Sequence, residues 1–173
     1  MFLRSRGYWL IFMQDINHVN KEDSMTNEKI IGDRSEQVAN WYFRLNGFMT
    51  IPGFVVHPDL REWETPQRTE ADIIGVRLPF SCEYADKKMK DDDNIINIYR
   101  GKTPRNLLII VEVKSGKCEI NGAWSKRERK NMQRVIRRIG FVKNETDLDI
   151  VSNKIYDIGR YEDDNNILQY ICI

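Results

Sequence analysis

The longest aliphatic run of the chain, residues 107–111, predicts a strand that is buried on both faces. The run reads Leu-Leu-Ile-Ile-Val and is bounded by a proline and a glycine. Glu112 and Lys114 follow it without a turn signal, and Val113 separates them. Because side chains alternate across a strand, we expect both charges on one face. Two charges at this position are costly unless they pair, bind a metal or take part in catalysis.

The preceding part of the chain predicts a helix and two strands. Asp33-Arg34-Ser35-Glu36 resembles a capping box, which would begin a helix at Asp33 and give Glu36 a purely structural role. Asn46-Gly47 ends that helix. Its apolar residues recur at helical spacing, at Val38, Trp41, Tyr42 and Leu45. Residues 48–57 predict a bent strand or two short ones, and residues 58–68 predict a loop.

A short strand at residues 69–76 carries two acids, Glu70 and Asp72, on one face. A strand with one solvated face would explain them equally well. Residues 81–106 are polar and predict a solvated insertion, with a strand at 95–99. Its acidic run, residues 91–93, lacks the glycine and the terminal glutamate of an EF-hand loop, so we expect no calcium site there.

Residues 125–139 predict a strongly basic helix. They hold seven lysines and arginines against one acid, although the whole chain has a net charge of only +1. An apolar stripe at helical spacing consists of Met132, Val135, Ile136 and Ile139. Solvated helix faces usually mix charge signs, so the single sign favours a track for a phosphate backbone. A further helix around residues 148–158 and a final strand at 168–173 complete the predicted elements.

Composition narrows the class of protein. The chain of 173 residues has three widely spaced cysteines and two histidines, so we expect neither a structural zinc site nor a disulfide framework. The apolar run at residues 8–13 is too short to span a bilayer. We therefore expect a cytoplasmic protein with no membrane partner. Residues 1–24 fit the rest poorly and form an N-terminal extension, while residues 25–173 form one domain.

A specific resemblance joins these pieces. Asp72 followed by Glu112-Val113-Lys114 resembles the Asp…Glu-x-Lys signature of the PD-(D/E)xK nuclease superfamily, which has the restriction-endonuclease-like fold. Glu70-Ala71-Asp72 with Glu-Val-Lys is similar to small YraN-like nucleases, and the opening helix is similar to that of archaeal Holliday-junction resolvases. The resemblance covers roughly residues 30–140. Two departures are Ala71 in place of a proline and the separation of 40 positions from Asp72 to Glu112 (112 − 72), which is longer than in compact members.

The resemblance implies an α/β fold with an αβββαβ core, in which helices flank a mixed central sheet. It implies a nuclease that hydrolyses phosphodiester bonds in DNA with Mg²⁺, or alternatively Mn²⁺, held by Asp72, Glu112 and the Val113 carbonyl. Lys114 would act on the attacking water, and Glu36 and Glu70 would be second-tier metal ligands. The predicted nucleic-acid contacts are Lys126, Arg127, Lys130, Gln133, Arg134 and Arg137, with Gln133 orienting Lys114 or a phosphate.

Three alternatives stay open at this point. The same fold could bind nucleic acid without cleaving it. An interaction protein could use Glu112 and Lys114 as a mere ion pair, and its basic helix could dock onto an acidic partner. A nucleotide-binding fold is disfavoured because residues 115–117 lack the phosphate-binding glycine pattern. The sequence leaves a homodimer open and does not distinguish DNA from RNA.

Overall fold

The computed structural model describes residues 24–57, 69–114, 116–118 and 122–173, with side chains from residue 34 onward. All but the last residue of the predicted N-terminal extension and the whole predicted loop at 58–68 lie outside the described residues. None of the described helices has the length and the apolarity needed to cross a membrane.

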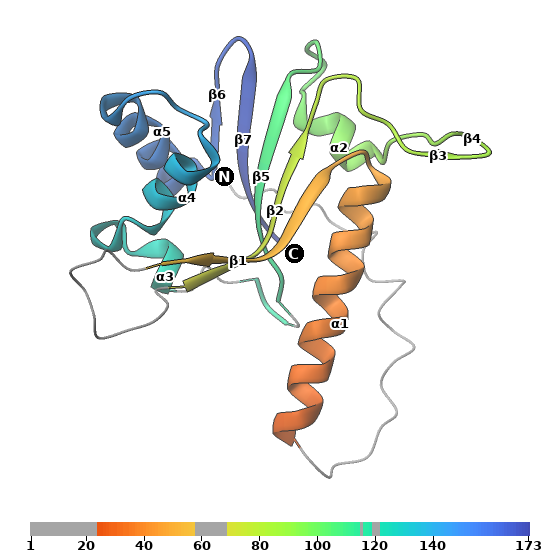
Figure 1. Ribbon diagram of the computed structural model, residues 1–173, viewed down its shortest axis with the longest axis horizontal. Helices are drawn as coiled ribbons and strands as arrows, with labels where there is room; N and C mark the ends of the chain where they lie inside the picture. Colours follow the sequence, from red (N-terminus) through yellow and green to blue (C-terminus); the bar gives the residue numbers. More distant parts are fainter. Residues whose placement is uncertain (1–23, 58–68, 115, 119–121) are drawn as a thin grey trace.

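A five-stranded mixed sheet forms the centre of the molecule, in the strand order β1-β2-β5-β7-β6 (Figure 1). Its strands are β1 (Met49–Val56), β2 (Thr69–Arg77), β5 (Asn106–Glu112), β6 (Arg160–Glu162) and β7 (Asn166–Cys172). β5 pairs antiparallel with β2 and parallel with β7. Residues 107–111 are therefore covered on both edges and both faces, as the aliphatic run predicts.

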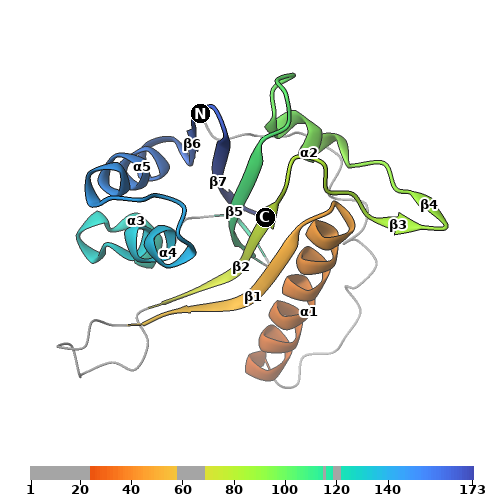
Figure 2. The same cartoon turned by 45° about the horizontal axis from the view of Figure 1, so that its top comes forward.

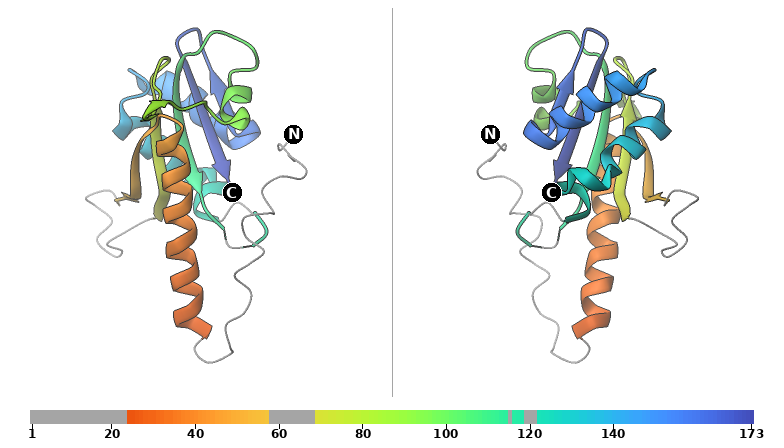
Figure 3. Two further views of the ribbon diagram at one scale, coloured as in Figure 1. Left: turned by 90° about the vertical axis from the view of Figure 1, so that its right-hand side faces the viewer. Right: turned by 90° about the vertical axis from the view of Figure 1, so that its left-hand side faces the viewer.

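Helices cover both faces of the sheet (Figure 3). On one side lie α1 (Ser24–Leu45) and α2 (Asp93–Ile98), packed over Ile73, Ile109 and Val111. On the other side lie α3 (Gly122–Ser125), α4 (Asn131–Ile139) and α5 (Glu145–Ile158), packed over Ile74 and Ile110. The predicted α/β class and the flanked mixed sheet are thus confirmed.

The first helix differs from its prediction in two respects. It begins at Ser24 and not at Asp33, so the capping-box prediction is wrong. Residues 24–32 include the good helix formers Met25, Glu28 and Lys29, and extending an existing helix is favourable. Its core side consists of Ala39 and Phe43, whereas Val38, Trp41 and Leu45 are exposed. Its predicted end is confirmed, because the helix stops at Leu45 and Gly47 follows in the left-handed conformation, with a φ of +78°.

The insertion folds into a small hairpin, β3 (Tyr84–Ala85) and β4 (Lys87–Lys88), followed by α2. The predicted strand at 95–99 is wrong because this segment is helical. Asp92 caps α2 by accepting a hydrogen bond from the Asn94 N–H, and Ile95 is buried one turn later. The acidic run has structural partners, because Asp91 pairs with Arg77 and Asp92 accepts from the Tyr42 hydroxyl at 3.0 Å.

The predicted continuous helix at 125–139 is also wrong. The segment forms α3, a 3₁₀ turn at Arg127–Arg129 and then α4, and the break falls at Lys130, whose φ is +54°. The backbone therefore turns between the two halves of the basic segment. The predicted apolar stripe survives within α4, where Met132, Val135 and Ile136 are buried against the sheet.

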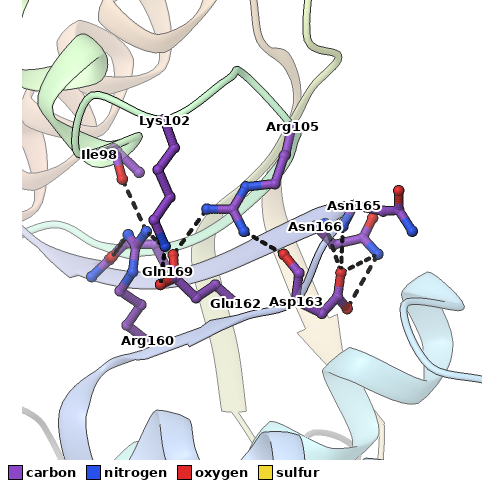
Figure 4. Close-up of polar contacts among 9 residues, drawn as sticks. All are labelled: Ile98, Lys102, Arg105, Arg160, Glu162, Asp163, Asn165, Asn166 and Gln169. Atoms are coloured by element: carbon purple, nitrogen blue, oxygen red, sulfur yellow. Dashed lines mark hydrogen bonds and ion pairs between the residues drawn. The ribbon is translucent and has the colours of Figure 1, made fainter.

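A charged cluster ties the β6–β7 hairpin to the segment that precedes β5 (Figure 4). Glu162 accepts hydrogen bonds from Arg160 at 2.8 Å and from Arg105 at 2.9 Å, and Lys102 lies 3.3 Å away. Arg160 also donates to the Ile98 carbonyl at the end of α2. The hydrogen bonds from Arg160 and Arg105 lower the pKa of Glu162 from 4.5 to about 2. We name this group the Glu162 cluster.

One disulfide contradicts the expectation from cysteine spacing. Cys118 and Cys172 are bonded, with their Cα atoms 5.9 Å apart, while Cys82 is free. The bond links the segment after β5 to the end of β7. A separation of 54 residues conceals this pairing in the sequence, because only the parallel β5–β7 pairing brings the two together.

Candidate active site

Asp72 and Glu112 meet where the β2–β5 ladder ends. The last pair in this antiparallel register joins Ile73 to Val111, so the next position places Asp72 opposite Glu112. Their neighbours two residues along, Ile74 and Ile110, belong to the cluster beneath α4 and α5. Because side chains alternate, both carboxylates lie on that same face. Figure 2 shows β2 and β1 bending away together near this point, where the pairing of β2 with β5 ends.

The backbone continues past the end of β5 in a strand-like path. The Lys114 N–H donates to the Ile173 carbonyl at 2.7 Å, and the Ile173 N–H donates to the Glu112 carbonyl. The backbone N–H of the intervening residue, Val113, points away from β7 and donates to Asp72 Oδ2 at 2.6 Å. Since the N–H and C=O of one extended residue point to the same side, the Val113 carbonyl lies on the Asp72 side.

The two predicted charges of the Glu-x-Lys segment contact each other. Lys114 Nζ lies 2.5 Å from Glu112 Oε1. Glu112 is only 3% exposed, whereas the Lys114 side chain is 30% exposed. The prediction that both share one face is confirmed, and the lysine reaches from a buried carboxylate toward solvent.

Both carboxylates have raised pKa values. Burial raises the pKa of Glu112 most, the charge of Asp72 raises it further, and Lys114 and Trp124 oppose these effects. Burial also raises the pKa of Asp72, with a contribution from Glu70, against the Val113 N–H and Lys114. Lys114 is thus the one cation among the described residues that lowers the pKa of both desolvated carboxylates, so the negative charge of Asp72 and Glu112 is only partly balanced.

Trp124 is a member of this site that the sequence reasoning missed. It lies in α3 with 2% exposure, and the proximity of its indole N–H lowers the pKa of Glu112. Its ring also packs on Tyr170, with centroids 6.4 Å apart. The only signal in the sequence was a tryptophan shortly after the charged end of the predicted strand. Its spacing from Glu112 along the chain does not reveal that the two side chains lie close together.

The two second-tier carboxylates differ in where they lie, because Glu70 is close enough to Asp72 to raise its pKa, whereas Glu36 lies on the other side of the sheet. Glu70 is exposed, and its Oε1 would lie 2.9 Å from a Cβ built on Gly53 of β1. Glu36 is half-buried on α1, which covers the opposite face of the sheet. No group of three or more His, Cys, Asp or Glu side chains able to hold a metal occurs among the described residues. The metal-binding roles of Glu36 and Glu70 therefore stay predictions.

The basic segment has its acidic partner within the same chain. Arg127 pairs with Asp157 of α5, and Arg137 pairs with Glu145 of α5 at 2.5 Å. Gln133 donates to Asp149 of α5 at 2.5 Å and not to Lys114. Two of the seven cations therefore pair with α5, Arg127 from the 3₁₀ turn and Arg137 from α4. Cations of the segment that are exposed include Lys126 and Lys130, close to α3.

The chain was compared with known proteins on three levels. It matches no protein-family model, and the searches of curated proteins and of solved structures also find no match.

Proposed function

We propose that the protein is a metal-dependent nuclease of the PD-(D/E)xK type, with the restriction-endonuclease-like fold. The observation that carries this proposal is the position of Asp72 opposite Glu112, beside Lys114. A strand acid 40 residues earlier has no structural need to meet the Glu-x-Lys segment (112 − 72). Two carboxylates can hold a metal ion that assists phosphodiester hydrolysis, and a lysine beside them can act on the attacking water.

The order of elements supports the same proposal. Without the insertion, the short elements α3 and the 3₁₀ turn, α5 and β6, the chain runs α1, β1, β2, β5, α4 and β7, which is the αβββαβ order. The antiparallel β1-β2-β5 meander is followed by a helical crossover to the parallel strand β7. The carboxylates lie at the end of the central strand, where side chains from neighbouring strands converge.

The residues present fit a magnesium ion. Two carboxylates and one backbone carbonyl are oxygen donors, which Mg²⁺ prefers, and this ion usually keeps several of its waters. The raised pKa values of Asp72 and Glu112 indicate that a further cation would relieve their repulsion. When bound, Mg²⁺ or Mn²⁺ would neutralise phosphate oxygens and lower the pKa of a bound water.

Each residue then has a separate role. Asp72, Glu112 and the Val113 carbonyl would hold the ion. Lys114 would hold the attacking water or stabilise the developing negative charge. Trp124 would keep Glu112 oriented through its indole N–H. Lys126 and Lys130 are exposed near α3 and would contact the phosphate backbone of DNA.

The decisive experiment is cleavage with Mg²⁺ across plasmid, linear, single-stranded and branched DNA, and RNA. Wild-type protein should cleave at least one substrate, and Lys114→Ala should not. Lys143→Ala, which removes an exposed lysine outside the site, is the matched control and should cleave like wild type. Cleavage that persists in both Lys114→Ala and Asp72→Ala would disprove the assigned site.

The competing explanation is a structural ion pair, and the 2.5 Å contact between Lys114 and Glu112 favours it. Under that explanation Mg²⁺ should not raise the thermal unfolding temperature of the wild-type protein. DNA affinity should then also be insensitive to salt, because no phosphate contacts would release counterions. A protein that binds DNA with a steep salt dependence but never cleaves it would be a binding module of the same fold.

A further inference from the structure

The disulfide between Cys118 and Cys172 lies beside the candidate active site. In the parallel β5–β7 register Cys172 is the partner of Glu112, so its side chain lies on the same face of the sheet as the Glu112 carboxylate. Cys118 follows Lys114 by four positions (118 − 114). The bond therefore joins the strand next to the carboxylate to the segment that carries the candidate catalytic lysine.

Two kinds of link hold the Lys114 segment to the end of β7. The first is backbone pairing, because the Lys114 N–H donates to the Ile173 carbonyl at 2.7 Å and the Ile173 N–H donates to the Glu112 carbonyl at 3.0 Å. The second is the disulfide, which attaches Cys118 to the residue before Ile173. Hydrogen bonds at the end of a strand open easily, whereas a covalent bond does not. Opening the disulfide would therefore loosen the segment that positions Lys114.

The disulfide lies where a reductant can approach it. Cys118 is exposed and Cys172 is half-buried. Exposed disulfides are typically the labile and regulatory ones, whereas structural disulfides resist reduction. A thiolate of a dithiol can attack the bond through a mixed disulfide. Two electrons and two protons then pass from the dithiol to the protein, which gains two thiols, and the dithiol becomes a cyclic disulfide.

We propose that this disulfide is a redox switch of the candidate active site. The oxidised form holds Lys114 beside Glu112, and reduction by a dithiol releases the lysine and slows cleavage. The inference rests on the proposed nuclease function. Asp72 and Glu112 adjoin the β2–β5 pairing, in which the disulfide takes no part, so reduction leaves the two carboxylates in place. The switch therefore acts on the lysine and not on metal binding.

The test compares oxidised and reduced wild-type protein at one temperature, below the unfolding transition of both forms. Reduction with excess dithiothreitol should lower kcat for Mg²⁺-dependent cleavage about tenfold or more, because a misplacement of about 1 Å at a catalytic group can cost about a hundredfold. The affinity for Mg²⁺, measured by titration calorimetry, should not fall, since both carboxylates stay in place. Reoxidation should restore the original rate.

Two variants serve as controls. Cys118→Ser cannot form the bond and should have the low rate with or without dithiothreitol. Cys82→Ser is the matched control, because Cys82 is free and its loss should leave the response to reduction unchanged. Thiol titration measures whether the bond has opened, and circular dichroism measures whether the reduced protein is folded.

The outcomes separate the switch from the nuclease proposal. If the reduced form cleaves as fast as the oxidised form, or faster, the switch is wrong and the nuclease proposal stands. Unfolding on reduction, a bond that dithiothreitol does not open, or a Mg²⁺ affinity that falls together with the rate would each show a structural crosslink and also overturn the switch. A wild-type protein that cleaves no substrate in either state overturns both.

Discussion

Strand β5 has a group of charged residues at each end. At its start, Glu162 is surrounded by Arg160, Arg105 and Lys102. At its other end, Asp72 and Glu112 share Lys114. Both groups combine carboxylates with cations, but the first group has three cations for one carboxylate and the second has one cation for two.

The two groups consequently differ in what they do to the fold. The pKa of Glu162 is lowered to about 2, so its ionised form stabilises the folded state. The pKa values of Asp72 and Glu112 are raised, so their ionised forms destabilise it. Carboxylates kept at an energetic cost are typical of functional sites, whereas saturated ion-pair clusters are typical of structural ones.

The largest expected effect is a difference in cleavage activity between variants at the two ends of β5. Asp72→Asn should reduce Mg²⁺-dependent cleavage at least about a hundredfold, as the loss of one catalytic electrostatic contact usually does. Glu162→Gln should leave the rate of the folded protein unchanged. Initial rates on the best substrate measure both. Equal losses in the two variants would remove the distinction between the groups.

The disulfide holds the carboxylate end, which lacks the ion pairs of the Glu162 cluster. Cys118→Ser should lower the free energy of unfolding by about 4 kcal/mol, the chain-entropy value for a closed loop of 54 residues. Cys82→Ser should have no comparable effect, because Cys82 is free. Urea unfolding under non-reducing conditions measures this difference, and an equal midpoint for both variants would contradict it.

Glu162→Gln should lower the free energy of unfolding by about 2 kcal/mol at pH 7, because it leaves buried arginine donors without a charged acceptor. The contribution of Glu162 is fully present above its ordinary pKa of 4.5 and is lost as the pH falls through about 2. The difference from wild type should therefore shrink between pH 4.5 and 2 in urea unfolding experiments. A constant difference over this range would mean that the carboxylate charge is not responsible.

The smallest expected effect has the opposite sign. Asp72→Asn should raise the free energy of unfolding by about 1 kcal/mol at pH 7, a usual size for a stabilising substitution. The neutral amide avoids the charge that burial opposes, and its oxygen can still accept from the Val113 N–H. The gain should vanish at a pH below 3.8, the ordinary pKa of an aspartate, because Asp72 of the wild-type protein is then protonated in both the folded and the unfolded state. A destabilised variant at pH 7 would show that the carboxylate supports the fold.

Local patterns predicted what depends on local geometry. Strand alternation placed Glu112 and Lys114 on one face, and the aliphatic run located β5 at the centre of the sheet. The residues of the main candidate pair, Asp72 and Glu112, were also found from sequence. Their meeting was implied only by the resemblance, because register between strands this far apart is not a local property.

What the sequence did not predict depends on long-range packing. The strand predicted at 95–99 is a helix because Asp92 caps it and Ile95 finds a place in the core. Arg127 of the 3₁₀ turn and Arg137 of α4 meet acids of α5 only after these segments fold onto the sheet. The disulfide and the contacts of Trp124 likewise require distant segments to meet.

The aliphatic run of β5 has a cost during folding. Its partner β7 pairs with it across 60 residues of sequence, so this edge of β5 is completed late. Until then, five aliphatic residues with high β-propensity lie on an open strand edge, which is a sequence type prone to aggregation. Variants that slow the docking of β7 should therefore reduce the soluble yield, even where the finished fold and its site are unaffected.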